Sequence, residues 1–278
     1  MNVKIIADSC CDLSPSLKQL TGVELVPLQL QIGEQFFKDD EQLDINQYIE
    51  LMKNSPVSPK TACPSPQDFI NYFSGSNHIF CVTISKELSG TYQSAVIAKE
   101  IYLEDHPDAK IHIFNSKSAS AGQTLIVLKI HELLQQGKSF DDIVHEVETF
   151  IDEMDTVFLL ERLENLAKSG RLSPILAKVA NFLSIKVIAK DSPEGTIVLE
   201  QKVRGYKRAY RRFIDTIEKY GKNLEEKTLV ISHCNALERA QAFKTEVEAR
   251  YSFKDIHIVH TGGVATSYAD EGGLIIAF

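Results

Sequence analysis

The regular alternation of short apolar segments with amphipathic ones between residues 79 and 154 constrains the fold more than any other feature of the sequence. Buried strands are predicted at Ile79–Ile84 and Lys110–Phe114, and helices at Gly90–Leu103, Ser120–Gln136 and Phe140–Met154. Strands that are apolar on both faces and alternate with helices form parallel sheets covered on both sides. We therefore predict an N-terminal α/β domain over residues 1–154, with a parallel sheet flanked by helices.

The remainder of the chain shows a different pattern. Ile185–Ala189 and Thr196–Val203 flank a Ser-Pro-Glu-Gly turn, which predicts an antiparallel hairpin. The flanking elements predict a C-terminal α/β domain with a mixed sheet over residues 155–278. Its other predicted strands are Val157–Leu160, Thr228–Ser232, Ile256–His260 and Leu274–Phe278, and its predicted helices are Leu163–Ala167, Pro174–Leu183, Lys207–Tyr220 and Leu237–Tyr251.

The first 75 residues carry weaker signals. Val3–Ala7 predicts a strand, and Val23–Ile32 predicts one strand that pairs across a turn at Gly33 with Gln35–Phe37. Asp44 is predicted to cap a helix that runs to Met52.

Composition argues against several classes of protein. Hydrophobic residues make up 44% of the 278 residues and charged residues 24%, which is typical of a globular chain. The formal net charge of −8 argues against a general nucleic-acid binder, since a phosphate backbone requires a basic surface. The five cysteines and eight histidines show no metal-site or disulfide spacing, and no apolar stretch reaches the roughly 18–20 residues that span a bilayer. We expect a cytoplasmic protein without a metal and without membrane insertion.

A polar segment follows the predicted strand Ile79–Ile84, at the end of a parallel strand where open sheets bind ligands. Ser89 is predicted to cap the next helix, and Gly90 allows a ligand to approach the backbone. The free N–H groups at a helix start favour an anion. An ordinary helix cap explains the same residues, so this segment alone does not establish a site.

Two loops also carry small polar residues. Around Thr61, Ala62 and Cys63, a proline-stiffened loop presents a hydroxyl and a thiol, although taken alone it is better explained as a connecting loop. The run from Thr261 to Gly273 contains four glycines and several hydroxyls between two predicted strands. It indicates close backbone approach either to a ligand or to another part of the protein.

A basic cluster stands out in this acidic chain. It combines the turn around Arg171 with Arg204 and the basic helix that follows. Charge runs usually form solvated helix faces, and a docking surface for an acidic partner or a phosphate is the alternative interpretation.

Taken in order along essentially the whole chain, these segments resemble the DegV family of bacterial fatty-acid-binding proteins. Each fragment is weakly specific, and the resemblance rests on their order and spacing. The fragments are Asp8-Ser9-Cys10-Cys11-Asp12-Leu13, Val26-Pro27-Leu28, Lys60-Thr61, Pro64-Ser65, Leu88-Ser89-Gly90-Thr91-Tyr92-Gln93-Ser94-Ala95, Ser116-Lys117-Ser118-Ala119-Ser120, Ser169-Gly170-Arg171-Leu172-Ser173, Ile185-Lys186 and Val203-Arg204-Gly205.

The resemblance implies a non-catalytic carrier that binds one long-chain fatty acid between two domains, with no cofactor. It implies that the acyl chain enters an apolar tunnel while the carboxylate meets the hydroxyls of Thr61 and Ser89, beside Ala62 and Gly90. It also implies a partner, an ATP-dependent fatty acid kinase subunit that phosphorylates the bound carboxylate. Arg171 and Arg204 then become candidates for kinase docking or for pairing between the domains.

The sequence departs from the family pattern in two places. The loop that usually reads Thr-Ser-Gln-Pro has Ala62 and Cys63 at its centre, and Tyr268 stands where a histidine is usual. A phenol donates a hydrogen bond to a carboxylate but does not become a cation near neutral pH. The hypothesis is that Tyr268 contacts the carboxylate while phosphoryl transfer is impaired, and that Asp270 and Glu271 repel a free carboxylate.

Two other interpretations stay open. A hydrolase could use Ser89 or Cys63 as its nucleophile, but no motif supplies the general base that it requires. The chain also lacks Gly-x-Ser-x-Gly, P-loop and dinucleotide-binding motifs. The second alternative is a diverged binding module for another lipid or a small carboxylate.

Overall fold

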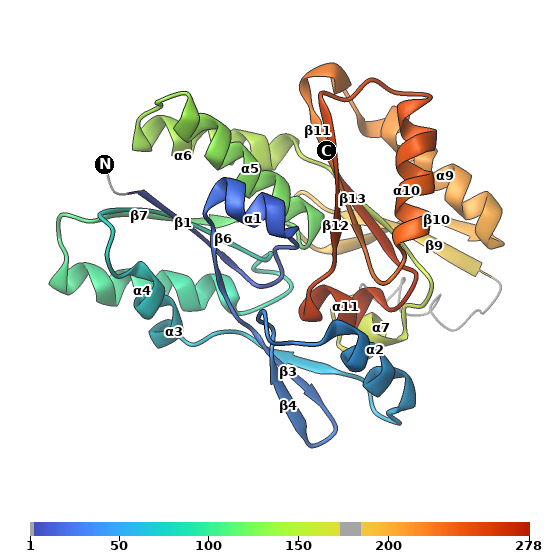
Figure 1. Ribbon diagram of the computed structural model, residues 1–278, viewed down its shortest axis with the longest axis horizontal. Helices are drawn as coiled ribbons and strands as arrows, with labels where there is room; N and C mark the ends of the chain where they lie inside the picture. The colour runs from blue at the N-terminus through green and yellow to red at the C-terminus, as the bar shows by residue number, and fades with distance from the viewer. Residues whose placement is uncertain (1–2, 173–184) are drawn as a thin grey trace.

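A four-stranded parallel sheet occupies the first half of the chain, as the alternating pattern predicts. The computed structural model describes residues 3–172 and 185–278 (Figure 1). Neighbouring strands of this sheet all run in the same direction. In spatial order they are β2 (Glu24–Val26), β1 (Val3–Asp8), β6 (His78–Thr83) and β7 (Lys110–Asn115).

Helices cover both faces of this sheet. Apolar side chains of α3 (Pro66–Phe73) and α4 (Thr91–Asp105) pack on one face. Those of α1 (Pro15–Thr21), α5 (Ala121–Gln135) and α6 (Phe140–Glu153) pack on the other (Figure 1). The layered α/β arrangement predicted for the first half is therefore confirmed.

The second half forms a mixed sheet, also as predicted. Among the described strands, β11 and β12 pair in parallel and every other neighbouring pair is antiparallel. The predicted hairpin is the β9–β10 pair. The order is β10 (Ile197–Arg204), β9 (Ile185–Asp191), β8 (Thr156–Leu160), β13 (Leu274–Ala277), β11 (Thr228–His233) and β12 (Asp255–His260).

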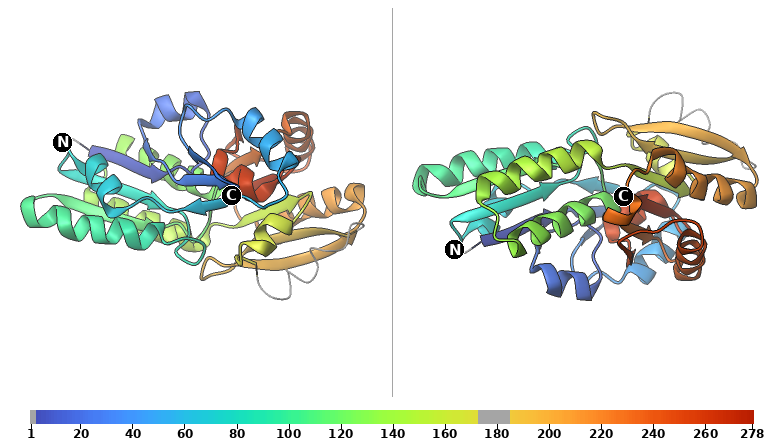
Figure 2. Two further views of the ribbon diagram at one scale, coloured as in Figure 1. Left: turned by 90° about the horizontal axis from the view of Figure 1, so that it is seen from below. Right: turned by 90° about the horizontal axis from the view of Figure 1, so that it is seen from above.

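The two sheets share a core through α5. Helices α9 (Tyr206–Tyr220) and α10 (Leu237–Glu248) pack on one face of the mixed sheet, and α5 packs on the opposite face. The blue-to-green and yellow-to-red parts of the chain lie side by side in Figure 2. The proposed domain boundary at residue 154 falls between α6 and β8, and the apolar side chains on its two sides belong to one cluster.

A small antiparallel sheet corrects the prediction for the first 75 residues. The strand expected at Val23–Ile32 breaks at Pro27, whose backbone has no N–H to donate. Its first part is β2 of the parallel sheet, and its second part is β3 (Gln29–Ile32). Strand β3 pairs with β4 (Gln35–Lys38) across the Gly33 turn, as predicted, and with β5 (Lys60–Ala62), which was expected to be a loop.

The other elements include one that the sequence did not predict. Helix α11 (Gly263–Ala269) lies within the segment 261–273 that was expected to be a loop. The helix predicted at Pro174–Leu183 lies outside the described residues. The remaining elements are α2 (Ile45–Asn54), α7 (Glu164–Lys168) and the 3₁₀ turn η1 (Leu224–Glu226).

Buried carboxyl groups from the start of the chain hold the N-terminus of α11. Asp39 accepts hydrogen bonds from the N–H groups of Gly263 (2.6 Å) and Val264 (3.0 Å), and Asp12 accepts one from Gly262 (2.7 Å). Acceptors at these positions satisfy N–H groups that a helix leaves free, and a negative charge there matches the helix dipole. Burial raises the pKa of Asp12 to about 7, against the hydrogen bonds from Ser120 and Gly262 that lower it.

This pKa predicts a pH-dependent stability. Because the pKa of Asp12 is higher in the folded protein than in the unfolded chain, its contribution is fully present below about pH 4 and is lost as the pH rises through about 7. The contribution of Asp12 to the unfolding free energy should fall between pH 5 and pH 8. In Asp12→Asn the decrease in unfolding free energy over this range should therefore be smaller than in the wild type, by on the order of 2 kcal/mol. Urea denaturation at both pH values measures this. Asp141→Asn, on the exposed surface of α6, should keep the wild-type difference; an equal difference in Asp12→Asn would contradict the assignment.

Candidate functional site

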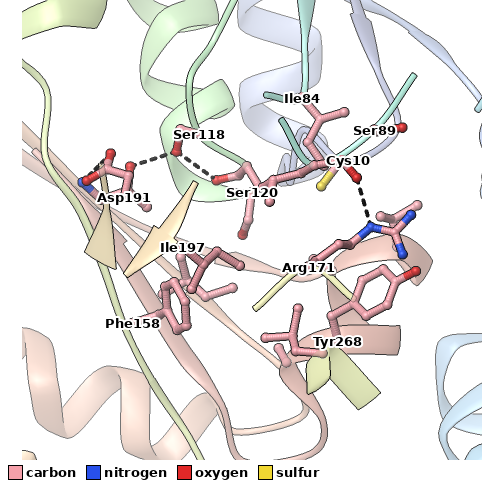
Figure 3. A pocket seen from close by; sticks show the side chains of 18 of the residues that line it. Cys10, Ile84, Ser89, Ser118, Ser120, Phe158, Arg171, Asp191, Ile197 and Tyr268 are labelled. Carbon is pink, nitrogen blue, oxygen red and sulfur yellow. Dashed lines mark hydrogen bonds between the residues drawn. The ribbon is translucent and has the colours of Figure 1, made fainter. Parts of the chain in front are cut away.

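A pocket lies where the carboxyl ends of the parallel strands meet one face of the mixed sheet (Figure 3). It encloses about 830 Å³ of empty space counted out to its opening. The position of the pocket agrees with the general rule that open α/β sheets bind ligands beyond the carboxyl ends of their strands.

The body of the pocket is apolar. Side chains alternate along β8, so that Thr156, Phe158 and Leu160 line the pocket while Val157 and Leu159 pack toward the opposite layer of helices. Burial against this hydrocarbon surface would stabilise the binding of an apolar ligand much more than that of a polar one. Further apolar lining comes from Leu28, Ile84, Leu88, Leu166, Ile197, Val264 and Ile275.

Four polar side chains gather at one end of the pocket, which we call the arginine end: Thr61, Ser89, Arg171 and Tyr268. The hydroxyls of Thr61 and Tyr268 lie 2.8 Å apart within hydrogen-bonding distance. Arg171 donates from Nε to the carbonyl of Leu88 (2.8 Å), and its guanidinium lies 5.2 Å from the centre of the Tyr268 ring (Figure 3). This end therefore combines hydroxyl groups with a cation, a set that suits a carboxylate.

Ser89 does not cap the helix, contrary to the prediction. Gly90 occupies the N-cap of α4, and no side chain makes the capping hydrogen bond. The Ser89 hydroxyl instead lies 2.9 Å from that of Thr91 and lines the pocket. Of the other predicted contacts, Ala62 and Gly90 are exposed and do not line the pocket.

The two acids after α11 do not line the pocket. Glu271 pairs with Lys53 on α2 (2.8 Å) and accepts a hydrogen bond from Asn235 (2.6 Å). Asp270 lies 3.9 Å from the guanidinium of Arg162. Because both carboxylates have nearby cations and neither faces the pocket, the geometry gives no support to the expected repulsion.

The two candidate docking arginines lie in different places. Arg171 is part of the pocket, where it bridges the loop after β6 and α11. Arg204 is exposed at the end of β10 and does not line the pocket. Helix α9 begins two residues after Arg204 and exposes four more basic side chains: Lys207, Arg208, Arg211 and Arg212.

The arginine end of the pocket offers little to a catalytic mechanism. Over residues 3–172 and 185–278, the pocket lining contains no histidine, and the Ser89 side chain forms hydrogen bonds with Thr91 alone. Cys63 is exposed beside the pocket rather than within it. No group of three His, Cys, Asp or Glu side chains in the described part of the chain could hold a metal ion. None of the described helices is long and apolar enough to cross a membrane.

Sequence reasoning missed the opposite end of the pocket. There Ser118, Thr156 and Asp191 come together from the loop after β7 and from two strands of the mixed sheet. The period-two pattern of β8 was a usable signal for Thr156. The position of Asp191 in the pocket lining had no such signal, because an aspartate before a turn usually faces water.

Comparison with known proteins gives a consistent result over the whole length. Residues 2–278 match the family model described as "Uncharacterised protein, DegV family". A DegV domain-containing protein of Streptococcus gordonii is 37% identical over 281 residues, covering 100% of this chain and 99% of that protein.

Solved structures with the same fold carry fatty acids. A DegV family protein from Ruminococcus gnavus, refined with vaccenic acid, is 39% identical with a TM-score of 0.95 and covers 99% of both chains. The fatty acid kinase B3 protein of Streptococcus pneumoniae, loaded with linoleic acid, is 38% identical with a TM-score of 0.93 and covers 100% of this chain and 99% of that one. With the family model matched from residue 2 to residue 278, the chain belongs to the DegV family.

Proposed function

We propose that the protein binds one long-chain fatty acid, with the carboxylate at the arginine end and the acyl chain along the apolar body of the pocket. The observation that carries this proposal is an apolar cavity wall with a cluster of hydroxyls and a guanidinium at one end. The fatty acids present in the R. gnavus and S. pneumoniae relatives support the same ligand class.

The two parts of the pocket have separate energetic roles. Burial of a sixteen-carbon tail at about 0.8 kcal/mol per CH₂ gives a gross gain near 11 kcal/mol. A hydrogen bond to a charged group contributes about 1.5–3 kcal/mol. The tail therefore sets most of the affinity, while Thr61, Ser89, Arg171 and Tyr268 prevent a buried carboxylate from being left unpaired.

A separate kinase subunit would carry out the chemistry. The hydroxyls of the arginine end have no general base beside them in the described part of the chain, which suits a carrier that presents a carboxylate rather than an enzyme that transforms it. Tyr268 stands where the family usually has a histidine, so the proposed phosphoryl transfer lacks a nearby imidazolium. Acyl phosphate formation at equal rates by the wild-type protein and Tyr268→His would contradict this effect of the tyrosine.

Arg171 provides the direct test of carboxylate binding. Arg171→Gln should weaken the binding of palmitate by about 10–100-fold, because it removes a charged hydrogen-bond donor. Displacement of a fluorescent fatty acid from delipidated protein measures this.

Hexadecanol and a surface variant serve as controls for Arg171→Gln. Hexadecanol has the same tail and no carboxylate, so its affinity should change little. Arg162→Gln removes an exposed arginine outside the pocket and should bind palmitate normally. Equal losses for palmitate and hexadecanol would show that Arg171 only supports the structure, and that the carboxylate lies elsewhere.

Arg204 tests the proposed partner surface. Charge reversal in Arg204→Glu should leave palmitate binding unchanged, because the residue does not line the pocket, and should weaken association with the kinase subunit by about tenfold at low salt. Titration calorimetry with the kinase subunit measures this, and Lys38→Glu on the exposed β4 strand is the matched control. Loss of palmitate binding in Arg204→Glu, or an unchanged partner affinity, would rule out this assignment.

A further inference from the structure

The pocket has a second polar end, formed by Ser118, Thr156 and Asp191, which we call the aspartate end. Figure 3 shows it on the side of the pocket away from Arg171 and Tyr268, with Phe158 and Ile197 along the wall near it. The two ends carry opposite formal charges. An acyl chain whose carboxylate lies at the arginine end therefore points its methyl end toward Asp191.

The carboxyl group of Asp191 is held by hydrogen bonding and not by a cation. It accepts a hydrogen bond from the backbone N–H of Thr156 (3.1 Å), and the Thr156 hydroxyl lies 2.7 Å from that of Ser118. Two lysines lie near Asp191, and both have other partners. Lys190 precedes it in the sequence, and Lys117 lines the pocket. Lys190 pairs with Asp155 (3.0 Å) and Lys117 with Asp152 (2.5 Å). Within the described part of the chain, Asp191 takes part in no ion pair.

Asp191 is half-buried, next to the buried side chains of Ser118 and Thr156. Its partial burial raises the pKa of Asp191 to about 7, although the Thr156 hydrogen bond and the charge of Lys190 lower it. An acid in this position is stabilised by the water that still reaches it and by a few hydrogen bonds. A methyl group pressed against it would remove that water without offering a hydrogen bond in return.

We propose that Asp191 is a specificity-determining residue that limits how far an acyl chain extends into the pocket, and so sets the preferred chain length. This inference rests on the proposed function. Each added methylene is stabilised while it contacts the apolar wall formed by side chains such as Phe158 and Ile197. The gain in binding free energy per methylene ends where the acyl chain reaches the carboxyl group of Asp191. Polar atoms, rather than lack of space, set this limit on chain length.

Two variants of nearly the same shape separate polarity from space at this position. Valine is shorter than aspartate by one side-chain atom, so Asp191→Val removes the carboxyl group and also some of its reach. We expect this variant to prefer acids longer by about two carbons. Acids beyond the wild-type optimum should bind about fourfold more tightly per added methylene, which corresponds to about 0.8 kcal/mol per CH₂ at 1.4 kcal/mol per tenfold.

Asp191→Thr is the matched variant, because threonine and valine have nearly the same shape and differ by a hydroxyl in place of a methyl group. It should keep the wild-type length preference. Displacement titrations with delipidated protein and saturated acids of about twelve to twenty carbons measure all three proteins. Thermal unfolding establishes that each variant is folded.

The outcomes distinguish a failure of the role of Asp191 from a failure of fatty acid binding itself. Equal length profiles for Asp191→Val and Asp191→Thr, or a shift of the valine variant toward shorter acids, would overturn the role of Asp191 while leaving fatty acid binding intact. A wild-type protein that binds none of the acids would instead refute the proposed function, and with it the inference drawn from it.

Discussion

The pocket depends on the hydrogen bonds that Asp12 and Asp39 accept from the N-terminus of α11. These carboxyl groups belong to the first part of the chain, whereas α11 lies near its end and is followed by β13 at the centre of the mixed sheet. Tyr48 on α2 adds a third connection, since its hydroxyl lies 2.7 Å from that of Ser267. Because α11 carries Tyr268 and part of the apolar wall, the arginine end is complete only when both parts of the chain are in place.

The periodic elements could be predicted because their stability follows from local pattern. The parallel strands, the long helices and the β9–β10 hairpin all have apolar faces that identify them in the sequence. Helix α11 could not, since two glycines at its start disfavour a helix and the acceptors that stabilise it come from Asp12 and Asp39, more than 200 residues earlier. Pro27, by contrast, is a residue in the sequence that predicts the break in the strand, and the prediction of one continuous strand overlooked it.

The sequence predicted several residues of the site but not how their side chains are arranged. The motifs led to Thr61, Ser89 and Tyr268, which the structure brings to one end of the pocket. They assigned Arg171 to kinase docking or to pairing between the domains rather than to the ligand site, because the direction of its side chain depends on Leu88 and Tyr268 in distant segments. Asp191 was missed for a related reason: its place in the pocket depends on the position of the β9–β10 turn, where the Ser85 hydroxyl donates to the carbonyl of Gly195 (2.8 Å).

A pocket with a cation at one end, hydrocarbon along its length and no histidine in its described lining is suited to holding an acyl chain in one orientation. The protein purified from cells should therefore contain a bound lipid. Native mass spectrometry of the purified protein, followed by organic extraction and identification of the lipid, tests this most directly. We predict one long-chain fatty acid per chain. A protein that is empty and takes up no added fatty acid, or that carries a ligand without a carboxylate, would contradict the account.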